Sequence, residues 1–374
     1  MRMPFGAMPS AMQIEPRESP PQWTHESCWA WRIVQAMTLL HTLLFVVFLA
    51  TLASAAGAAE ASCAGASLLD RLEREDPQKS TEIRALATAT VNGDGIFWKV
   101  SRPGLAPSYV LGTMHSPDAR IARLDDVVGK AFADARLVLV ENVESLDREA
   151  MPKAMTALRD LILLSDGATL DALVGQEHAG ALRQASEAHG IAWPVARMLQ
   201  PWMVAAAIAL PACDAKARQE GAPVLDQMIA ERARRSGKRL EGLETIREQF
   251  SAIAGLPRQF HVNAIVDLLA LGPLVDDLNE TTKQLYLAGR TGMMLPLARA
   301  FSPRTYAGPG AGEFQAKLIS ERNRRMVERA LPHLSEGGVF VAVGALHLPG
   351  ADGLIELLRQ KGFSVERVAH PERS

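Results

Sequence analysis

Apolar and polar residues follow two patterns along this chain. Strand-like and helical segments alternate near its ends, and helical periodicity dominates its middle. Near both ends, short strand-like apolar runs are separated by a turn and a segment with helical spacing. The order strand, helix, strand therefore occurs twice, in residues 96–145 and 336–370, and right-handed crossovers would make each a parallel βαβ unit. The apolar runs cover residues 109–111, 137–140, 339–343 and 363–368.

Between these two units, which would each supply half of a site, residues 146–335 show mainly helical periodicity. This predicts a large helical insertion. The stretch 238–245 interrupts it with a strand-like run that we expect to join the sheet. Residues 96–100 and 108–111 flank a Pro-Gly turn, a pattern typical of a hairpin. The chain is thus predicted to be an α/β (α+β) protein, with two repeated βαβ units in one sheet and a helical insertion, in a single domain over residues 64–374.

The longest apolar run lies ahead of this domain, at residues 37–52, with Arg32 before it and small residues at 53–59. A basic flank, an apolar run and an A-x-A-like zone are typical of a secretory signal, so residues 1–59 are expected to be an extension with a signal peptide. A retained inner-membrane anchor and a buried helix are the alternatives. With either a signal or an anchor, the domain would be periplasmic or secreted.

Composition and cysteine number agree with such a location. The hydrophobic content of 48% is ample for a core, and a net charge of -2 gives no reason to expect a nucleic-acid partner. Cys28 would leave with the signal, so Cys63 and Cys213 would remain. In an oxidising compartment two remaining cysteines favour one disulfide, and two unpaired thiols are the alternative.

Two histidines occupy matched positions after apolar runs. Gly112 begins a G-x-x-H motif that ends at His115, and Gly344 begins another that ends at His347. Each glycine would let the backbone bend, and each His would lie at the carboxyl edge of the sheet, where α/β proteins bind ligands. Glu141 directly follows the run 137–140 and reaches the same edge if its strand is a parallel neighbour.

Two imidazoles and a carboxylate allow two kinds of chemistry. They can bind a divalent transition metal, with manganese, cobalt and zinc as candidates, and leave positions open for water. They can also form a metal-free acid/base set. A zinc-type H-x-x-x-H spacing is absent from the sequence, so a metal does not follow from spacing.

Four further polar residues are candidates, Arg322 as a catalytic residue and the other three as secondary ones, each with a structural alternative. Arg322 could hold a substrate carboxylate or an oxyanion, or it could lie with Asn323 on a solvated helix face. Glu244 follows the strand-like run and could instead form a salt bridge or an N-cap. Asp226 opens a predicted helix, where it could be the cap.

The chain resembles the TraB/GumN family, which includes the Tiki metalloproteases. The family's two G-x-x-H motifs map onto His115 and His347, its glutamate after the second strand onto Glu141, and its arginine onto Arg322. The resemblance implies a pseudo-twofold α/β core with a helical insertion. The matching stretches are FWKV (97–100), YVLGTMH (109–115), LVLVEN (137–142), QPW (200–202), VLDQMIAERA (224–233), GKRLEGLETIREQF (237–250), ERN (321–323) and VAVGALHLPGADGLIELLRQKGFSVERV (341–368).

The resemblance makes a periplasmic metal-dependent hydrolase the leading hypothesis, specifically a peptidase of Tiki type acting on a peptide or other small substrate. His115, Glu141 and His347 would hold a divalent ion or activate water, and Arg322 would stabilise the oxyanion. The alternative is a non-catalytic protein that binds haem or another ligand, or an accessory factor for envelope polysaccharide or signalling. The same imidazoles could ligate haem iron.

Overall fold

The computed structural model describes residues 63, 65–147, 151–165 and 167–369. The predicted signal segment therefore lies outside the described residues. Within these ranges, no helix combines the length and the apolar character needed to cross a bilayer.

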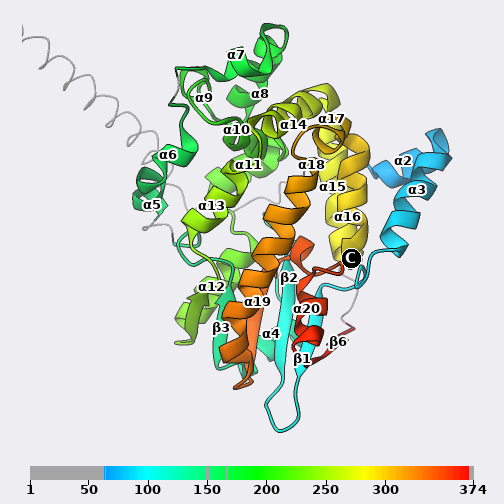
Figure 1. Cartoon of the computed structure of the whole chain (residues 1–374), viewed down its shortest axis with the longest axis vertical. Helices are drawn as coiled ribbons and strands as arrows, with labels where there is room; N and C mark the ends of the chain where they lie inside the picture. Colours follow the sequence, from blue (N-terminus) through cyan, green and yellow to red (C-terminus); the bar gives the residue numbers. More distant parts are fainter. Residues whose placement is uncertain (1–62, 64, 148–150, 166, 370–374) are drawn as a thin grey trace, which may run out of the picture. The chain divides into compact units, whose positions relative to one another are not determined.

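Six strands form one mixed sheet in the order β4-β3-β5-β2-β1-β6. Strands β1, β2, β3 and β6 are labelled in Figure 1. Strands β4, β3, β5 and β2 are parallel, and β1 is antiparallel to both β2 and β6. The expected hairpin is the β1–β2 pair, and the strand-like run near residue 240 joins the sheet as β4. The bounds are β1 Phe97–Ser101, β2 Ser108–Thr113, β3 Leu137–Val140, β4 Arg239–Gly242, β5 Val339–Gly344 and β6 Ser364–Arg367.

The two predicted strand–helix–strand units are present, but the strands of each unit are not neighbours. Strand β5 lies between β2 and β3, while β2 and β1 separate β5 from β6. The expectation of two simple parallel βαβ units is therefore corrected: the units interlock, and the last part of the chain supplies the strand next to β2. Periodicity identifies strands but carries no information on their lateral order.

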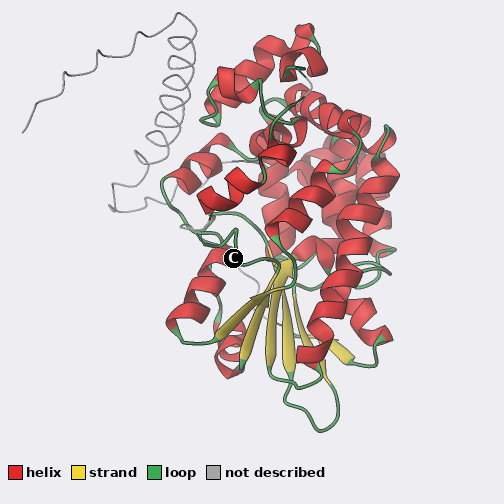
Figure 2. Cartoon of the chain, turned by 60° about the vertical axis from the view of Figure 1, so that its left-hand side comes forward, coloured by secondary structure: helices red, strands yellow, loops and turns green. Residues whose placement is uncertain are grey.

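Helices cover both faces of the sheet, as Figure 2 shows. Alternation along β5 divides the core: Phe340 and Ala342 pack on the face covered by α4 (Asp126–Asp134) and α12 (Leu225–Arg235). Val341 and its neighbours on the same side pack against α19 (Glu321–Leu334) and α20 (Leu354–Gln360). The central strand is buried on both faces, which explains its unbroken apolar run.

The segment between β3 and β5 is mainly helical, with β4 as its strand. Apart from α12 and α19, its helices gather at one end of the sheet (Figures 1 and 2). Since the chain leaves β3 into this segment, that end is the carboxyl edge of the parallel strands. The remaining helices of the segment are α5 (Met151–Ala157), α6 (Arg159–Ile162), α7 (Leu170–Val174), η1 (Gln176–His178), α8 (Ala179–Ala188), α9 (Trp193–Ala196), α10 (Pro201–Ile208), α11 (Ala212–Gln219), α13 (Ile246–Ala254), α14 (Arg258–Leu271), α15 (Leu274–Leu287), α16 (Thr291–Phe301), α17 (Pro303–Ala307), α18 (Ala311–Glu313) and the π-helix η2 (Phe314–Ser320).

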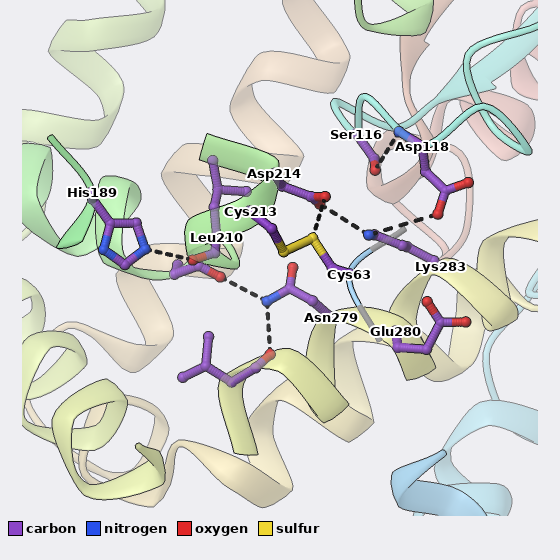
Figure 3. Close-up of a disulfide and its surroundings, with 12 residues drawn as sticks. Cys63, Ser116, Asp118, His189, Leu210, Cys213, Asp214, Asn279, Glu280 and Lys283 are labelled. Atoms are coloured by element: carbon purple, nitrogen blue, oxygen red, sulfur yellow. Dashed lines mark hydrogen bonds and ion pairs between the residues drawn. A yellow bond between two sulfur atoms is a disulfide. The ribbon is translucent and has the colours of Figure 1, made fainter. Parts of the chain in front are cut away.

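A disulfide joins Cys63, which precedes α2 (Leu68–Glu75) and α3 (Pro77–Thr88), to Cys213 of α11 (Figure 3). The predicted disulfide is thus confirmed.

Charged side chains are buried beside this disulfide. Lys283 is 1% exposed, and its Nζ lies 2.9 Å from Asp214 Oδ2 and 3.7 Å from Asp118 Oδ2 (Figure 3). Arg120 then links Asp118 to Glu280. Each buried charge has a partner of opposite sign, which offsets the large cost of removing it from water.

Candidate active site

The register of the sheet brings four strand ends to one level. Thr113 of β2 pairs with Gly344 of β5, and Val140 of β3 pairs with both Ala342 of β5 and Gly242 of β4. A candidate side chain follows each strand end within three residues: His115 after β2, Glu141 after β3, Glu244 after β4 and His347 after β5. Parallel pairing therefore gathers residues from distant parts of the sequence at one edge.

The two motif glycines allow close packing. Neither has a positive φ, so neither uses the left-handed conformation that glycine permits. A Cβ on Gly112 would lie 2.7 Å from Leu348 Cδ1 and 3.0 Å from Ala345 Cα. A Cβ on Gly344 would lie 3.0 Å from Glu141 Oε1. Both glycines therefore leave room, the first for the turn after β5 and the second for the candidate carboxylate.

His115 is oriented by a buried carboxylate. Its Nδ1 lies 2.8 Å from Asp226 Oδ2, and Thr113 Oγ1 donates a 2.6 Å hydrogen bond to Oδ1 of the same residue. Asp226 therefore binds the motif, while Val224 is the N-cap of α12. Since the carboxylate only accepts hydrogen bonds, Nδ1 carries the proton and Nε2 faces outward. Nε2 binds no other described residue.

Asp226 strongly stabilises the protonated form of His115, although the imidazole is exposed to solvent. Attraction to the Asp226 carboxylate raises the pKa of His115 to about 9, against opposition from burial and from the charge of Arg218. The imidazole side chain is 60% exposed, so water weakens this attraction.

His347 is buried, and its imidazole is held by a side-chain amide. It ends the short helix η3 (Ala345–His347), and its Nδ1 lies 2.6 Å from Asn323 Oδ1. The Asn323 amide nitrogen donates to the carbonyl of Asp352 at 2.7 Å, so Oδ1 is the acceptor for His347. Nδ1 therefore carries the proton, and Nε2 offers a lone pair. Burial lowers the pKa of His347 to about 4, despite the pull of Glu141, so the imidazole is neutral at pH 7.

Glu141 lies between these groups as an ionised carboxylate. Oε1 accepts a 2.6 Å hydrogen bond from the Gly344 amide and lies 3.9 Å from His347 Nε2. Oε2 accepts from Gln249 at 2.7 Å and from Arg322 at 2.8 Å. Burial opposes ionisation, but attraction to His347 and Arg322 outweighs it and lowers the pKa of Glu141 to about 2.

Arg322 is buried and fixes two carboxylates. Its Nη2 donates to both Glu141 and Glu244, and its Nε donates to Glu244 at 2.9 Å. Arg325 binds the other oxygen of Glu244 at 2.6 Å. The salt-bridge alternative for Glu244 is therefore correct, whereas the solvated-face alternative for Arg322 and Asn323 is wrong, because both are buried.

Sequence reasoning missed three residues that shape this site. Thr113 stands inside the first motif, so its position was a usable signal. Gln249 lies in the matching stretch 237–250 but was not singled out, and Tyr286 gave no signal, because each comes from an insertion helix. Gln249 binds Glu141, and the hydroxyl of Tyr286 donates a 2.8 Å hydrogen bond to the carbonyl of Gly112.

The donor set fits a divalent metal ion in its chemistry. Two imidazoles have Nδ1 held by a side-chain oxygen, a common arrangement around metal-binding histidines, and a carboxylate lies near one of them. His115 binds a cation only after its Nε2 loses the proton. Within the described ranges, the ligand atoms of His115, Glu141 and His347 do not all lie within 4.8 Å of one another. Those of Cys63, Cys213 and Asp214 do, but their sulfurs form the disulfide.

Comparison with known proteins points to one family. The model of the TraB/PrgY/gumN family matches residues 96–367, a range that holds every side chain of the site. Metalloprotease TIKI2 of Danio rerio is 25% identical over 329 residues, 75% of this chain and 62% of that protein. Metalloprotease TIKI1 of Homo sapiens is 24% identical over 322 residues, 73% of this chain and 62% of that protein. The match thus spans about three-fifths of these relatives' length.

A relative from Nematostella vectensis, named a Metalloprotease TIKI homolog, is 25% identical over 334 residues, 75% of this chain and 69% of that protein. No solved structure gives a significant match.

Proposed function

Since this chain belongs to the TraB/PrgY/gumN family and is distantly related to the Tiki metalloproteases, we propose that it is a metal-dependent hydrolase that cleaves peptide bonds. One observation carries the proposal. The Nδ1 atoms of His115 and His347 are both held by side-chain oxygens, so both Nε2 atoms are left for a ligand, with ionised Glu141 beside His347. The reaction class is that of the relatives, which are named metalloproteases.

Three residues would hold the ion: His115 and His347 through Nε2, and Glu141 through Oε1. A bound divalent ion supplies a Lewis acid for the scissile carbonyl and makes water more acidic. The protein's own part is to orient these donors and keep water-binding positions open. Because the three ligand atoms are not preassembled within 4.8 Å, loading requires the side chains to move closer together.

Arg322 acts in this proposal through Glu141. Its Nη2 and Nε are engaged with carboxylates, so it keeps Glu141 ionised and fixed in orientation. Nη1 remains for a developing oxyanion, the role expected from the sequence. The low pKa of Glu141 keeps it ionised at neutral pH, so it is available as an anionic ligand for the ion.

Metal content and peptide hydrolysis test the function directly. Exported protein without a metal-binding tag is stripped with chelator, reloaded with manganese, cobalt or zinc, and assayed on a mixture of internally quenched peptides. We expect metal-dependent cleavage, and at least about a tenfold loss of metal affinity in His115→Ala and His347→Ala. His178→Ala is the control, since His178 lies near Glu177 and away from the strand ends.

Two results would contradict the proposal. One is a Soret absorption band in the purified protein, which would support the haem alternative. The other is equal metal affinity in wild type and in both folded histidine variants.

We also propose that the protein works outside the cytoplasm. The disulfide supports this, because such bonds persist in oxidising compartments. Thiol labelling of unreduced protein from the cell envelope should leave Cys63 and Cys213 unmodified until a reductant is added. Labelling of both thiols without reductant, or recovery of the protein from the cytoplasm alone, would contradict the location.

A further inference from the structure

An apolar cavity of about 220 Å³ lies next to the candidate site. Helices α3 and α16, the π-helix η2 and the turn after β5 surround it. A single charged side chain, that of Arg299, is among the described residues that line it. The apolar wall includes Leu86, Leu295, Pro296, Phe314, Ile319 and Leu346.

Two segments carry both the cavity and the site. Leu346 lines the cavity and is 37% exposed, while the next residue, His347, is buried and turned toward Glu141. Ile319 of the π-helix lines the cavity, and the same continuous helix then places Arg322 in the site. The π-helix is a rare form that occurs often at functional sites. The cavity is therefore built onto the backbone that holds the candidate centre.

The size and charge of the cavity define what it can hold. Whole small-molecule ligands occupy pockets of about 300–1,000 Å³, so this one is small for a cofactor but suitable for one side chain. Its wall offers apolar contact. Arg299 forms no ion pair with a described residue, and its guanidinium lies 5.8 Å from the Tyr306 ring centroid. A cationic side chain would therefore be repelled.

We propose that this cavity is a specificity pocket for an uncharged apolar side chain of a peptide substrate, such as leucine or phenylalanine. The proposal rests on the proposed peptidase function. An extended peptide advances about 3.3–3.6 Å per residue, and Leu346 adjoins His347. The preferred residue should therefore lie within roughly four positions of the scissile bond.

A leucine scan measures the preference. The substrates are internally quenched peptides built from glycine, serine and alanine. In each peptide one position is replaced by leucine, phenylalanine, glycine or lysine, and every position is varied in turn. We expect leucine or phenylalanine at one position to raise kcat/KM about tenfold or more over glycine, with lysine no better than glycine. Leu295→Trp, which fills the cavity, should abolish that gain while the rate on the glycine peptide stays within about twofold. Leu163→Trp is the matched control, at a 39% exposed leucine outside the cavity.

A second variant and a binding measurement keep the test decisive. If Leu295→Trp does not fold, Leu86→Arg replaces it, since Leu86 is 55% exposed and tolerates charge. N-acetyl-L-leucinamide, added to the intact metal-free chain, should shift the methyl NMR signals of Ile319 and Leu346, whereas N-acetylglycinamide should not.

The outcomes separate the two proposals. Peptide cleavage with no apolar preference at any position, or a leucine gain unchanged in the folded cavity variants, overturns the pocket and leaves the peptidase. Methyl shifts with N-acetyl-L-leucinamide, but no cleavage of any peptide by metal-loaded protein, overturn the peptidase and support the pocket's ligand class. A longer acyl amide that binds more tightly than every amino-acid amide assigns the cavity to a lipid chain and overturns the proposal.

Discussion

The side chains of the candidate site differ in how visible they are in the sequence. His115, His347 and Glu141 follow apolar runs, so position alone marked them as candidates. Their partners did not stand out in the same way. Asp226 and Asn323 were secondary candidates, with a cap and a solvated face as the alternatives, because their packing against the strand ends depends on tertiary structure.

Glu141→Gln separates charge from shape at the centre. The amide must turn its NH₂ toward a donor, either the Gly344 amide or the Arg322–Gln249 pair, so we expect a loss of about 1–3 kcal/mol in the free energy of unfolding with the fold retained. Metal affinity or hydrolytic rate should fall about a hundredfold or more.

Metal titration and kinetics on the same preparation check this expectation. Glu366→Gln is the control, because Glu366 is exposed on β6, the closing strand of the second unit. A folded Glu141→Gln protein with wild-type metal binding and rate would show that the carboxylate is only structural.

Asp226→Asn tests the orientation of His115. The amide can still contact Nδ1, but it no longer demands a proton there, so the tautomer that leaves Nε2 free loses its support. We expect metal affinity to fall about 10–100-fold. Nitrogen-15 NMR of the metal-free imidazole, recorded above pH 9 where His115 is neutral, should show Nδ1 protonated in wild type and a mixture of tautomers in the variant. Identical spectra would exclude an orienting role for Asp226.

At the scale of elements, the sequence predicted the type of each segment more accurately than its position in the fold. The apolar periodicity of the sequence predicted all six strands, β1 to β6, and the helical insertion. It did not predict the interlocked order, because the register of β5 against both β2 and β3 is fixed by burial of its two faces. The sequence pattern also did not predict the π-helix η2. Its backbone hydrogen bonds differ from those of an α-helix, but the spacing of its apolar residues does not.

Helix α13 provides a pH-dependent contact between elements. It begins with a capping box between Thr245 and Glu248, and Arg329 of α19 binds both oxygens of Glu248. The hydrogen bonds from Arg329 lower the pKa of Glu248 from 4.5 to about 2. The pair therefore stabilises the fold above about pH 4.5, and this contribution is lost as the pH falls toward 2.

Glu248→Gln keeps the cap and removes the charge. We expect it to lower the free energy of unfolding by about 0.5–1 kcal/mol at pH 7, with the difference shrinking between pH 4.5 and pH 2. Urea unfolding across this range measures it. Glu328→Gln, on the exposed side of α19, should change little at any pH. A constant difference between wild type and Glu248→Gln would mean that the charge is not its source.

At the scale of the whole molecule, the disulfide connects the segment before α2 to the helical insertion. Cys63 and Cys213 are 150 residues apart, so the bond closes a long loop and restricts the unfolded chain. The sequence predicted this pair by elimination. It did not predict the buried Lys283 beside it, because a lysine on a helix is normally read as exposed.

Removing the disulfide should lower the free energy of unfolding by about 2–5 kcal/mol. Urea unfolding of the oxidised chain, with and without dithiothreitol, measures the change. The double variant Cys63→Ala, Cys213→Ala should match the reduced protein and be insensitive to reductant. Equal unfolding midpoints for oxidised and reduced protein would contradict the prediction.

The central position of β5 also sets the order of events during biosynthesis. The Gly344 amide that binds Glu141 lies 203 residues further along the chain, and His347 follows it. A nascent chain that already contains His115, Glu141 and the whole helical insertion still lacks the strand on which they converge. Contacts so distant in sequence form slowly. The candidate side chains therefore come together only after nearly all of the described sequence has been synthesised.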